Sequence, residues 1–233
     1  MKVTFPEGFT VSEIAARLEE NGVCSSFDFL KQANNTEYLS EFGINIDNPS
    51  DRAFILEGYL FPDTYEFYRN EDAHSVIRRF LRNTFSHIDD GMISRAAELG
   101  FTIDEILTVA SIINEEAGIP SENRKISSVI YNRLKSPDFP KLQCDCCTFY
   151  IKDSVKPYVD EARFEELMNL YNTYRCKGLP AGPIANPGLE EINSALYPDD
   201  TDYYFFISDS DLNYYYAHDW DSHIKNCSAA GIN

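Results

Sequence analysis

The sequence has few basic residues, and this shortage is its most informative absence. It contains 20 lysine and arginine residues against 38 aspartate and glutamate residues, which gives a formal net charge of −18. Binding to nucleic-acid phosphates or to anionic lipid requires a basic patch. The composition therefore argues against nucleic acid as a partner and against electrostatic docking on a membrane. Neutral or cationic ligands, including uncharged polymers such as glycans, stay compatible with it.

Long apolar runs and a secretory leader are also missing. No apolar stretch reaches the roughly 20 residues that a bilayer-spanning helix needs, and no signal peptide opens the chain. Patterned sequence begins at once with MKVTFPEGFT, so we expect the soluble ectodomain of a longer protein. With 233 residues and 43% hydrophobic content, the chain can bury a substantial core.

Cysteine and histidine are too sparse to indicate a disulfide scaffold or a metal centre. Six cysteines are spread over 233 residues, apart from the C-x-C-C run at 144–147. A zinc site would need a second close pair of ligands, which the sequence does not supply. For His218 and His223, surface histidines beside aspartates compete with a metal pair. We expect no metal and no organic cofactor, and it stays open whether the 144–147 run forms a disulfide with Cys176 or holds free thiols.

The first 50 residues predict a small α/β unit. The stretch VTFPEGFT indicates a short strand and a turn, and VSEIAARLEENG (11–22) carries apolar residues at helical spacing. Thr10 is a suitable N-cap for this helix, and Gly22 is a suitable stop. A second short helix is expected after Ser26.

A turn signal, NPSD at 48–51, separates this unit from a larger one. We therefore divide the chain into residues 1–50 and 51–233. The larger unit predicts amphipathic helices, a loop that leads into a short strand at 56–67, and a hairpin, whereas 137–187 is rich in turn formers. The predicted fold class is α+β. Helices are expected at 73–88, 91–100, 103–117 and 121–135, and hairpin strands at 203–208 and 213–219.

The helix expected at 103–117 ends in two adjacent carboxylates, Glu115 and Glu116. On a helical wheel with Ile106 at zero, Glu115 lies at about 180° and Glu116 near −80°. Glu115 is therefore expected on the solvated face, whereas Glu116 flanks the apolar stripe. The apolar stripe around Ile106 comprises Val109, Ala110, Ile113 and Ala117.

The position of Glu116 has a chemical consequence. Partial desolvation and the negative end of a helix both raise the pKa of a carboxyl group. A glutamic acid that keeps its proton near neutral pH is suited to general-acid catalysis. The alternative is a boundary glutamate that pairs with a basic residue such as Arg124 or Lys125.

Six motifs extend this hypothesis to the whole chain: LEGYLFPDTYEF, ASIINEEAG, ISSVIYNRL, LQCD, YNTYRCKGLPAGPIANPG and FFIS. Their order and spacing resemble those of the endolytic murein transglycosylases of the MltG (YceG-like) family. The resemblance implies a bacterial cell-surface enzyme that cuts peptidoglycan glycan strands, with a membrane anchor, a LysM-like subdomain and a catalytic domain. Residues 1–50 would then be part of the LysM-like region and 51–233 the catalytic domain.

The resemblance also assigns roles to individual residues. The family's catalytic glutamate is the last acid of an A-S-I-x-E-x-E motif, which maps onto Glu116. The chain departs from the family at Asn114, where an acid is usual, although an amide there can still hydrogen-bond a sugar. LQCD corresponds to a family L-Q-T-D-P-T stretch that lines the cleft, and the YNTY loop is expected to face it. The expected substrate-binding residues are Asn114, Gln143, Asp145, Asn172, Thr173 and Tyr174.

The implied reaction needs one carboxyl group. Glu116 protonates the glycosidic oxygen between MurNAc and GlcNAc through an oxocarbenium-like transition state, and then accepts the proton of the MurNAc 6-hydroxyl. That hydroxyl attacks C1 and leaves a 1,6-anhydro ring, because its intramolecular position supplies effective molarity. Two alternatives stay open: a glycoside hydrolase that uses Glu116 and Asp145, and a catalytically silent glycan-binding module.

Partners and location also follow from the resemblance. The expected partners are peptidoglycan glycan strands and, at family level, the peptidoglycan synthesis machinery. The enzyme would act at the extracytoplasmic face of the bacterial membrane, held there by an N-terminal helix that is missing here.

Overall fold

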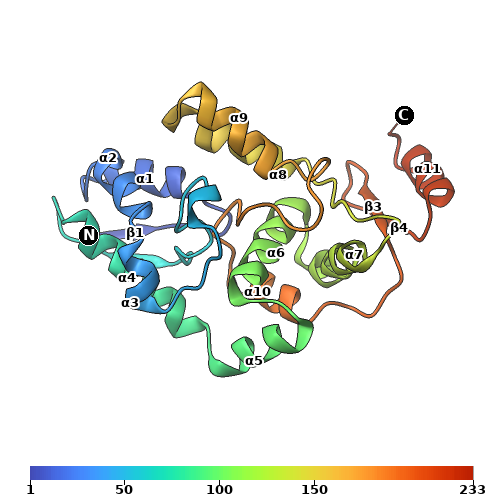
Figure 1. The fold of residues 1–233 in the computed structure, drawn as a ribbon, viewed down its shortest axis with the longest axis horizontal. Helices are drawn as coiled ribbons and strands as arrows, with labels where there is room; N and C mark the ends of the chain where they lie inside the picture. Colours follow the sequence, from blue (N-terminus) through green and yellow to red (C-terminus); the bar gives the residue numbers. More distant parts are fainter. Residues whose placement is uncertain (233) are drawn as a thin grey trace.

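The structure, a computed structural model, describes residues 1–232 and is built mainly from short helices with two small antiparallel sheets (Figure 1). It confirms the predicted α+β class. Of the helices in residues 1–232, none combines the length and the apolar character that crossing a bilayer requires. The elements in chain order are β1 (Lys2–Thr4), α1 (Val11–Glu20), α2 (Ser26–Ala33), α3 (Glu37–Phe42), β2 (Thr64–Glu66), α4 (Ala73–His87), α5 (Asp90–Leu99), α6 (Ile103–Glu116), α7 (Asn123–Lys135), α8 (Cys146–Phe149), α9 (Glu161–Leu170), α10 (Leu189–Leu196), β3 (Phe205–Ser208), β4 (Tyr214–Ala217) and α11 (Trp220–Ala229).

The N-terminal elements form where the sequence predicts them. Thr10 caps α1 through a capping box with Glu13, and the apolar stripe of α1 is buried. The helix α2 begins at Ser26 with Ser25 as its cap, one residue earlier than predicted. Strand β1 pairs with β2, and α2 packs on α4, so these contacts join the first 50 residues to the segment that follows. A separate LysM-like subdomain at 1–50 stays a prediction.

The helix α6 lies at the centre of the second half of the molecule (Figure 1). Thr102 caps it in a second capping box, and the helix ends at Glu116, one residue earlier than predicted. Ile106, Val109 and Ile113 are fully buried. Helices α7 and α10 pack against α6.

Several helices of the C-terminal half are absent from the prediction. The segment 137–187 contains α8, a π-helical stretch (Tyr150–Val155) and α9 among its turns. The helix α11, which was not predicted either, has no buried residue. The predicted hairpin does form, with β3 and β4 antiparallel, and α11 packs on both strands.

Candidate active site

Glu116 is the last residue of α6 and lines a cavity of about 370 Å³. One side of this cavity is polar and includes Gln143, Asp145 and Tyr174 besides Glu116. The other side is formed by α7, β3 and the first turn of α11. Four residues of the predicted site therefore meet in one cavity, although the first and the last are 58 positions apart in the sequence.

The carboxyl group of Glu116 is half-buried, and desolvation by this burial raises its pKa above the ordinary value. The nearby carboxylate of Asp145 raises it further. The Cys146 thiol opposes both effects, because it donates a hydrogen bond to Glu116 Oε1 at 3.2 Å. The net direction is upward, as a general acid requires.

The alternative in which Glu116 is a salt-bridged boundary residue is wrong. Arg124 pairs with Asp199, and Lys125 pairs with Glu122. In the described part of the chain no basic side chain forms an ion pair with Glu116. Its proton affinity is therefore not lowered by a paired cation.

Glu115 is exposed, which confirms the prediction from the helical wheel. It lines a separate cavity of about 280 Å³ with Gly8 and Glu13 of the N-terminal segment. Desolvation and the neighbouring acids raise its pKa too. A raised pKa therefore does not distinguish the two glutamates, whereas their surroundings do, because Gln143, Asp145 and Tyr174 share a cavity only with Glu116.

Gln143 is held in an unusual conformation at the cavity. Its φ is +58°, in the left-handed region that non-glycine residues seldom adopt. The buried guanidinium of Arg133 donates to Gln143 Oε1. Because this bond occupies the amide oxygen, the amide nitrogen is the group that Gln143 can offer to a ligand.

Arg133 is a residue to which the sequence analysis assigned no role. Besides Gln143 it binds Lys141 O through Nε at 2.8 Å and Tyr204 O through Nη1 at 3.0 Å. It therefore joins α7 to the LQCD loop and to the residue that precedes β3. Its presence in the motif ISSVIYNRL was the only available signal, and that motif does not reveal which backbone groups the arginine meets.

Three of the predicted substrate-binding residues do not line this cavity. Thr173 is fully buried, and its hydroxyl contacts both Cys144 N (2.9 Å) and Cys144 O (3.0 Å). The direct sugar contact predicted for Thr173 is therefore not available. The Thr173 hydroxyl binds the backbone of the LQCD loop instead. Asn172 Oδ1 accepts from Tyr174 N at 3.0 Å, and Asn114 lies beside Gly8. Sugar binding by Asn114 and Asn172 stays a prediction without support from their positions.

Tyr174 differs from its two neighbours in the YNTY loop. It is 42% exposed and lines the cavity. Desolvation and the Asp145 carboxylate raise the pKa of its phenol to about 12, so the hydroxyl stays protonated and can donate.

The six cysteines are free thiols, so the predicted alternative of a disulfide to Cys176 is not realised. Cys144 and Cys147 are buried, and Cys146 is half-buried beside Glu116. Within residues 1–232, no group of three or more His, Cys, Asp or Glu side chains is arranged to hold a metal ion. The alternative of a metal-binding histidine pair has no support from the contacts of the two rings: His218 Nδ1 lies 3.0 Å from Asp202, whereas His223 stacks on Phe205.

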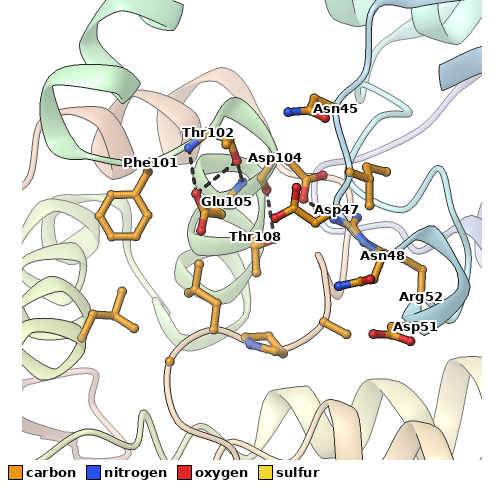
Figure 2. A pocket seen from close by; sticks show the side chains of 16 residues that line it. Asn45, Asp47, Asn48, Asp51, Arg52, Phe101, Thr102, Asp104, Glu105 and Thr108 are labelled. Carbon is orange, nitrogen blue, oxygen red and sulfur yellow. Dashed lines mark hydrogen bonds and ion pairs between the residues drawn. The ribbon is translucent and has the colours of Figure 1, made fainter. Parts of the chain in front are cut away.

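A second cavity, of about 420 Å³, lies at the other end of α6 (Figure 2). Its lining includes Asp104, whose carboxylate forms an ion pair with the buried Arg52 and accepts from Tyr59 at 2.7 Å. Asp104 and Glu116 are twelve residues apart, which is about 18 Å along a helix. None of the predicted site residues lines this second cavity.

Comparisons with known proteins identify relatives of this chain. The model of the YceG-like family matches residues 1–229. An endolytic murein transglycosylase of Bacillus subtilis (strain 168) is 31% identical over 225 residues, which cover 90% of this chain and 59% of the relative. An endolytic murein transglycosylase of Streptococcus pneumoniae (serotype 2, strain D39) is 26% identical over 96% of this chain and 43% of the relative. This chain thus spans about half the length of these curated relatives.

A solved structure shows the same fold. The crystal structure of a YceG-like protein from Listeria monocytogenes matches with a TM-score of 0.81 and 29% sequence identity. The match covers 96% of this chain and 74% of that chain. Together with the family match, it confirms the resemblance that the six motifs predict.

Proposed function

The chain belongs to the YceG-like family, and we propose that it is a lytic transglycosylase that cleaves the glycan strands of peptidoglycan. The names of its relatives in Bacillus and Streptococcus support this class of reaction. The observation that carries the proposal is the state of Glu116, a half-buried carboxyl group with a raised pKa and a polar cavity in front of it.

In the proposed mechanism Glu116 acts first as an acid. Its proton goes to the glycosidic oxygen between MurNAc and GlcNAc, and positive charge develops at C1 of the MurNAc ring. Glu116 is then a carboxylate and accepts the proton of the MurNAc 6-hydroxyl, whose oxygen bonds to C1. The product carries a 1,6-anhydro ring, no water is consumed, and the glutamic acid is restored for the next cycle.

The other polar groups have supporting roles in this proposal. Asp145 faces the same cavity, where its negative charge favours the protonated form of Glu116 and can stabilise the developing positive charge. The amide nitrogen of Gln143 and the hydroxyl of Tyr174 are donors that suit sugar oxygens or an N-acetyl carbonyl group. Membrane anchoring, action at the extracytoplasmic face and contact with the peptidoglycan synthesis machinery stay family-level predictions.

The products test this proposal. Purified sacculi are incubated with the protein, and the released muropeptides are analysed by mass spectrometry. A lytic transglycosylase gives 1,6-anhydro-MurNAc ends, whereas a hydrolase using Glu116 and Asp145 gives reducing ends heavier by one water molecule. Reducing ends would replace the proposal by the hydrolase alternative, and binding to sacculi without release would replace it by the binding module.

A further inference from the structure

One side of the Glu116 cavity is aromatic, and its outermost ring belongs to Trp220. This residue is the first of α11 and the only tryptophan of the chain. It is 57% exposed although it lines the cavity. Tryptophan combines a large apolar face with a polar N–H group and is enriched at contact surfaces, so its exposure beside a polar cavity suits contact with a ligand.

The ring of Trp220 is held in a defined orientation. It packs edge-to-face on Phe205, with ring centroids 5.8 Å apart, and it lies 5.4 Å from the ring of His223. Phe205 is itself in contact with Arg133, whose guanidinium carbon lies 5.2 Å from the centroid of the Phe205 ring. Asp219 caps α11 by accepting from Ser222 N at 2.8 Å, which fixes the backbone at Trp220. Little conformational freedom is left for a ligand to remove.

The charges around the cavity restrict the ligand. Glu116 and Asp145 are acidic, and the three nitrogens of Arg133 donate to protein oxygens. Desolvation and the charge of Arg133 lower the pKa of His223, so its ring stays neutral. The guanidinium of Arg133 is buried and each of its nitrogens already donates to a protein oxygen, so the more exposed groups of the cavity are acidic or neutral. This arrangement disfavours an anionic ligand, whereas a neutral ring with polar edges fits it.

We propose that Trp220 is a sugar-stacking platform that binds a pyranose ring of a β-1,4-linked N-acetylhexosamine strand in the Glu116 cavity. A pyranose has an apolar C–H face that can stack on the indole. Its hydroxyl and N-acetyl groups can bind Gln143, Asp145 and Tyr174. This inference rests on the proposed function for the identity of the glycan. It adds a binding residue that the sequence analysis did not identify.

The single tryptophan provides a direct test, since all indole fluorescence comes from Trp220. The Glu116→Gln variant, which is expected to bind without turnover, is titrated with a soluble β-1,4-linked N-acetylglucosamine oligosaccharide. The expected result is a saturable change in Trp220 emission. The dissociation constant obtained from this change should equal the one that calorimetry measures independently. An unchanged emission spectrum at a concentration that saturates the calorimetric signal would overturn the proposal, and so would a lack of binding by both methods.

Variants give a second test of the platform. In the Glu116→Gln background, Trp220→Ala should weaken calorimetric binding by roughly three- to tenfold, and Trp220→Phe should restore part of the loss. The matched control is Ile224→Ala, because Ile224 is also an exposed apolar residue of α11 but does not line the cavity. Equal affinity of the Trp220→Ala variant and its parent would contradict the platform.

The two proposals fail in different ways. In one outcome, the wild-type chain releases anhydro products, and a Trp220→Ala variant that keeps Glu116 has an unchanged KM for sacculi. The proposed transglycosylase activity then stands and the proposed platform is wrong. If the oligosaccharide changes Trp220 emission but no anhydro product is formed, the platform stands and the proposed reaction is wrong.

Discussion

The two ends of α6 carry carboxyl groups with different fates. Asp104, in the first turn, and Glu116, in the last, both have a pKa that desolvation raises. Asp104 is bound by the guanidinium of Arg52 and by the hydroxyl of Tyr59. Glu116 accepts a hydrogen bond from the thiol of Cys146, the nearby thiol of Cys144 also lowers its pKa, and no ion pair in the described chain includes it. The same helix therefore presents one acid fixed by structure and one acid available for chemistry.

Burial alone therefore does not identify a catalytic acid. Both carboxyl groups lie next to a cavity, and the cavity at Asp104 is the larger of the two, at about 420 Å³ against 370 Å³. The two sites differ in whether the polar side chains around the carboxyl group already bind it. At Glu116 the neighbouring polar side chains of Gln143, Asp145 and Tyr174 face the same empty space.

The largest expected effect is the loss of activity in Glu116→Gln. Glutamine keeps the shape of the side chain but can neither deliver nor accept the proton, so anhydro-product formation should fall by at least ~10²–10⁴-fold. Binding to sacculi should survive. The control is Glu115→Gln, one residue earlier and exposed, which should change the rate little. An inactive Glu115→Gln beside a normal Glu116→Gln would reverse the assignment.

At the other end of α6, Asp104→Asn should affect stability. The side chain of Asp104 is 12% exposed and that of Arg52 is 2% exposed, so the substitution leaves Arg52 as a buried charge without its partner. The free energy of unfolding should fall by about 3–5 kcal/mol, measured by urea denaturation at neutral pH. Asp51→Asn, in the same cavity but outside this ion pair, should stay within about 0.5 kcal/mol of wild type. Equal stability of the two variants would show that the Asp104 ion pair is not structural.

A smaller effect concerns the thiol of Cys146, the stronger of the two thiol contacts that lower the pKa of Glu116. The Cys146 thiol stabilises the carboxylate, so its removal in Cys146→Ala should raise the pKa of Glu116 further. The alkaline limb of the pH–rate profile should then move to higher pH, while the limiting rate changes little. Cys146→Ser, which keeps a donor, should leave the limb near the wild-type position, and so should Cys176→Ala. An unmoved limb in Cys146→Ala would mean that the thiol has no influence on Glu116.

The part of the fold that the sequence predicts is the part with strong local signals. The helix α6 has a cap at Thr102 and a regular apolar stripe, so its position and the surroundings of Glu116 follow from one stretch of chain. The helix α11 buries no residue, and its packing on β3 and β4 depends on contacts that no local pattern reports.

The site shows the same division. Gln143, Asp145 and Tyr174 were found through motifs, and they do reach the cavity. Thr173, in the same motif as Tyr174, points into the protein, because the loop needs its hydroxyl for the backbone of Cys144. Motif membership does not say which face of a loop a residue occupies. The role of Arg133 is also unpredictable from sequence, since its acceptor Tyr204 O is 71 residues away.

The pH dependence of kcat/KM for the wild-type chain on sacculi tests the central claim most directly. Glu116 must carry a proton to act as an acid, and that proton is present below its pKa and lost as the pH rises through it. Because the pKa is raised above the ordinary 4.5, activity should persist above pH 4.5 and then decline along a single alkaline limb. Activity already lost near pH 4.5, or a rate that stays constant into the alkaline range, would contradict Glu116 as the general acid.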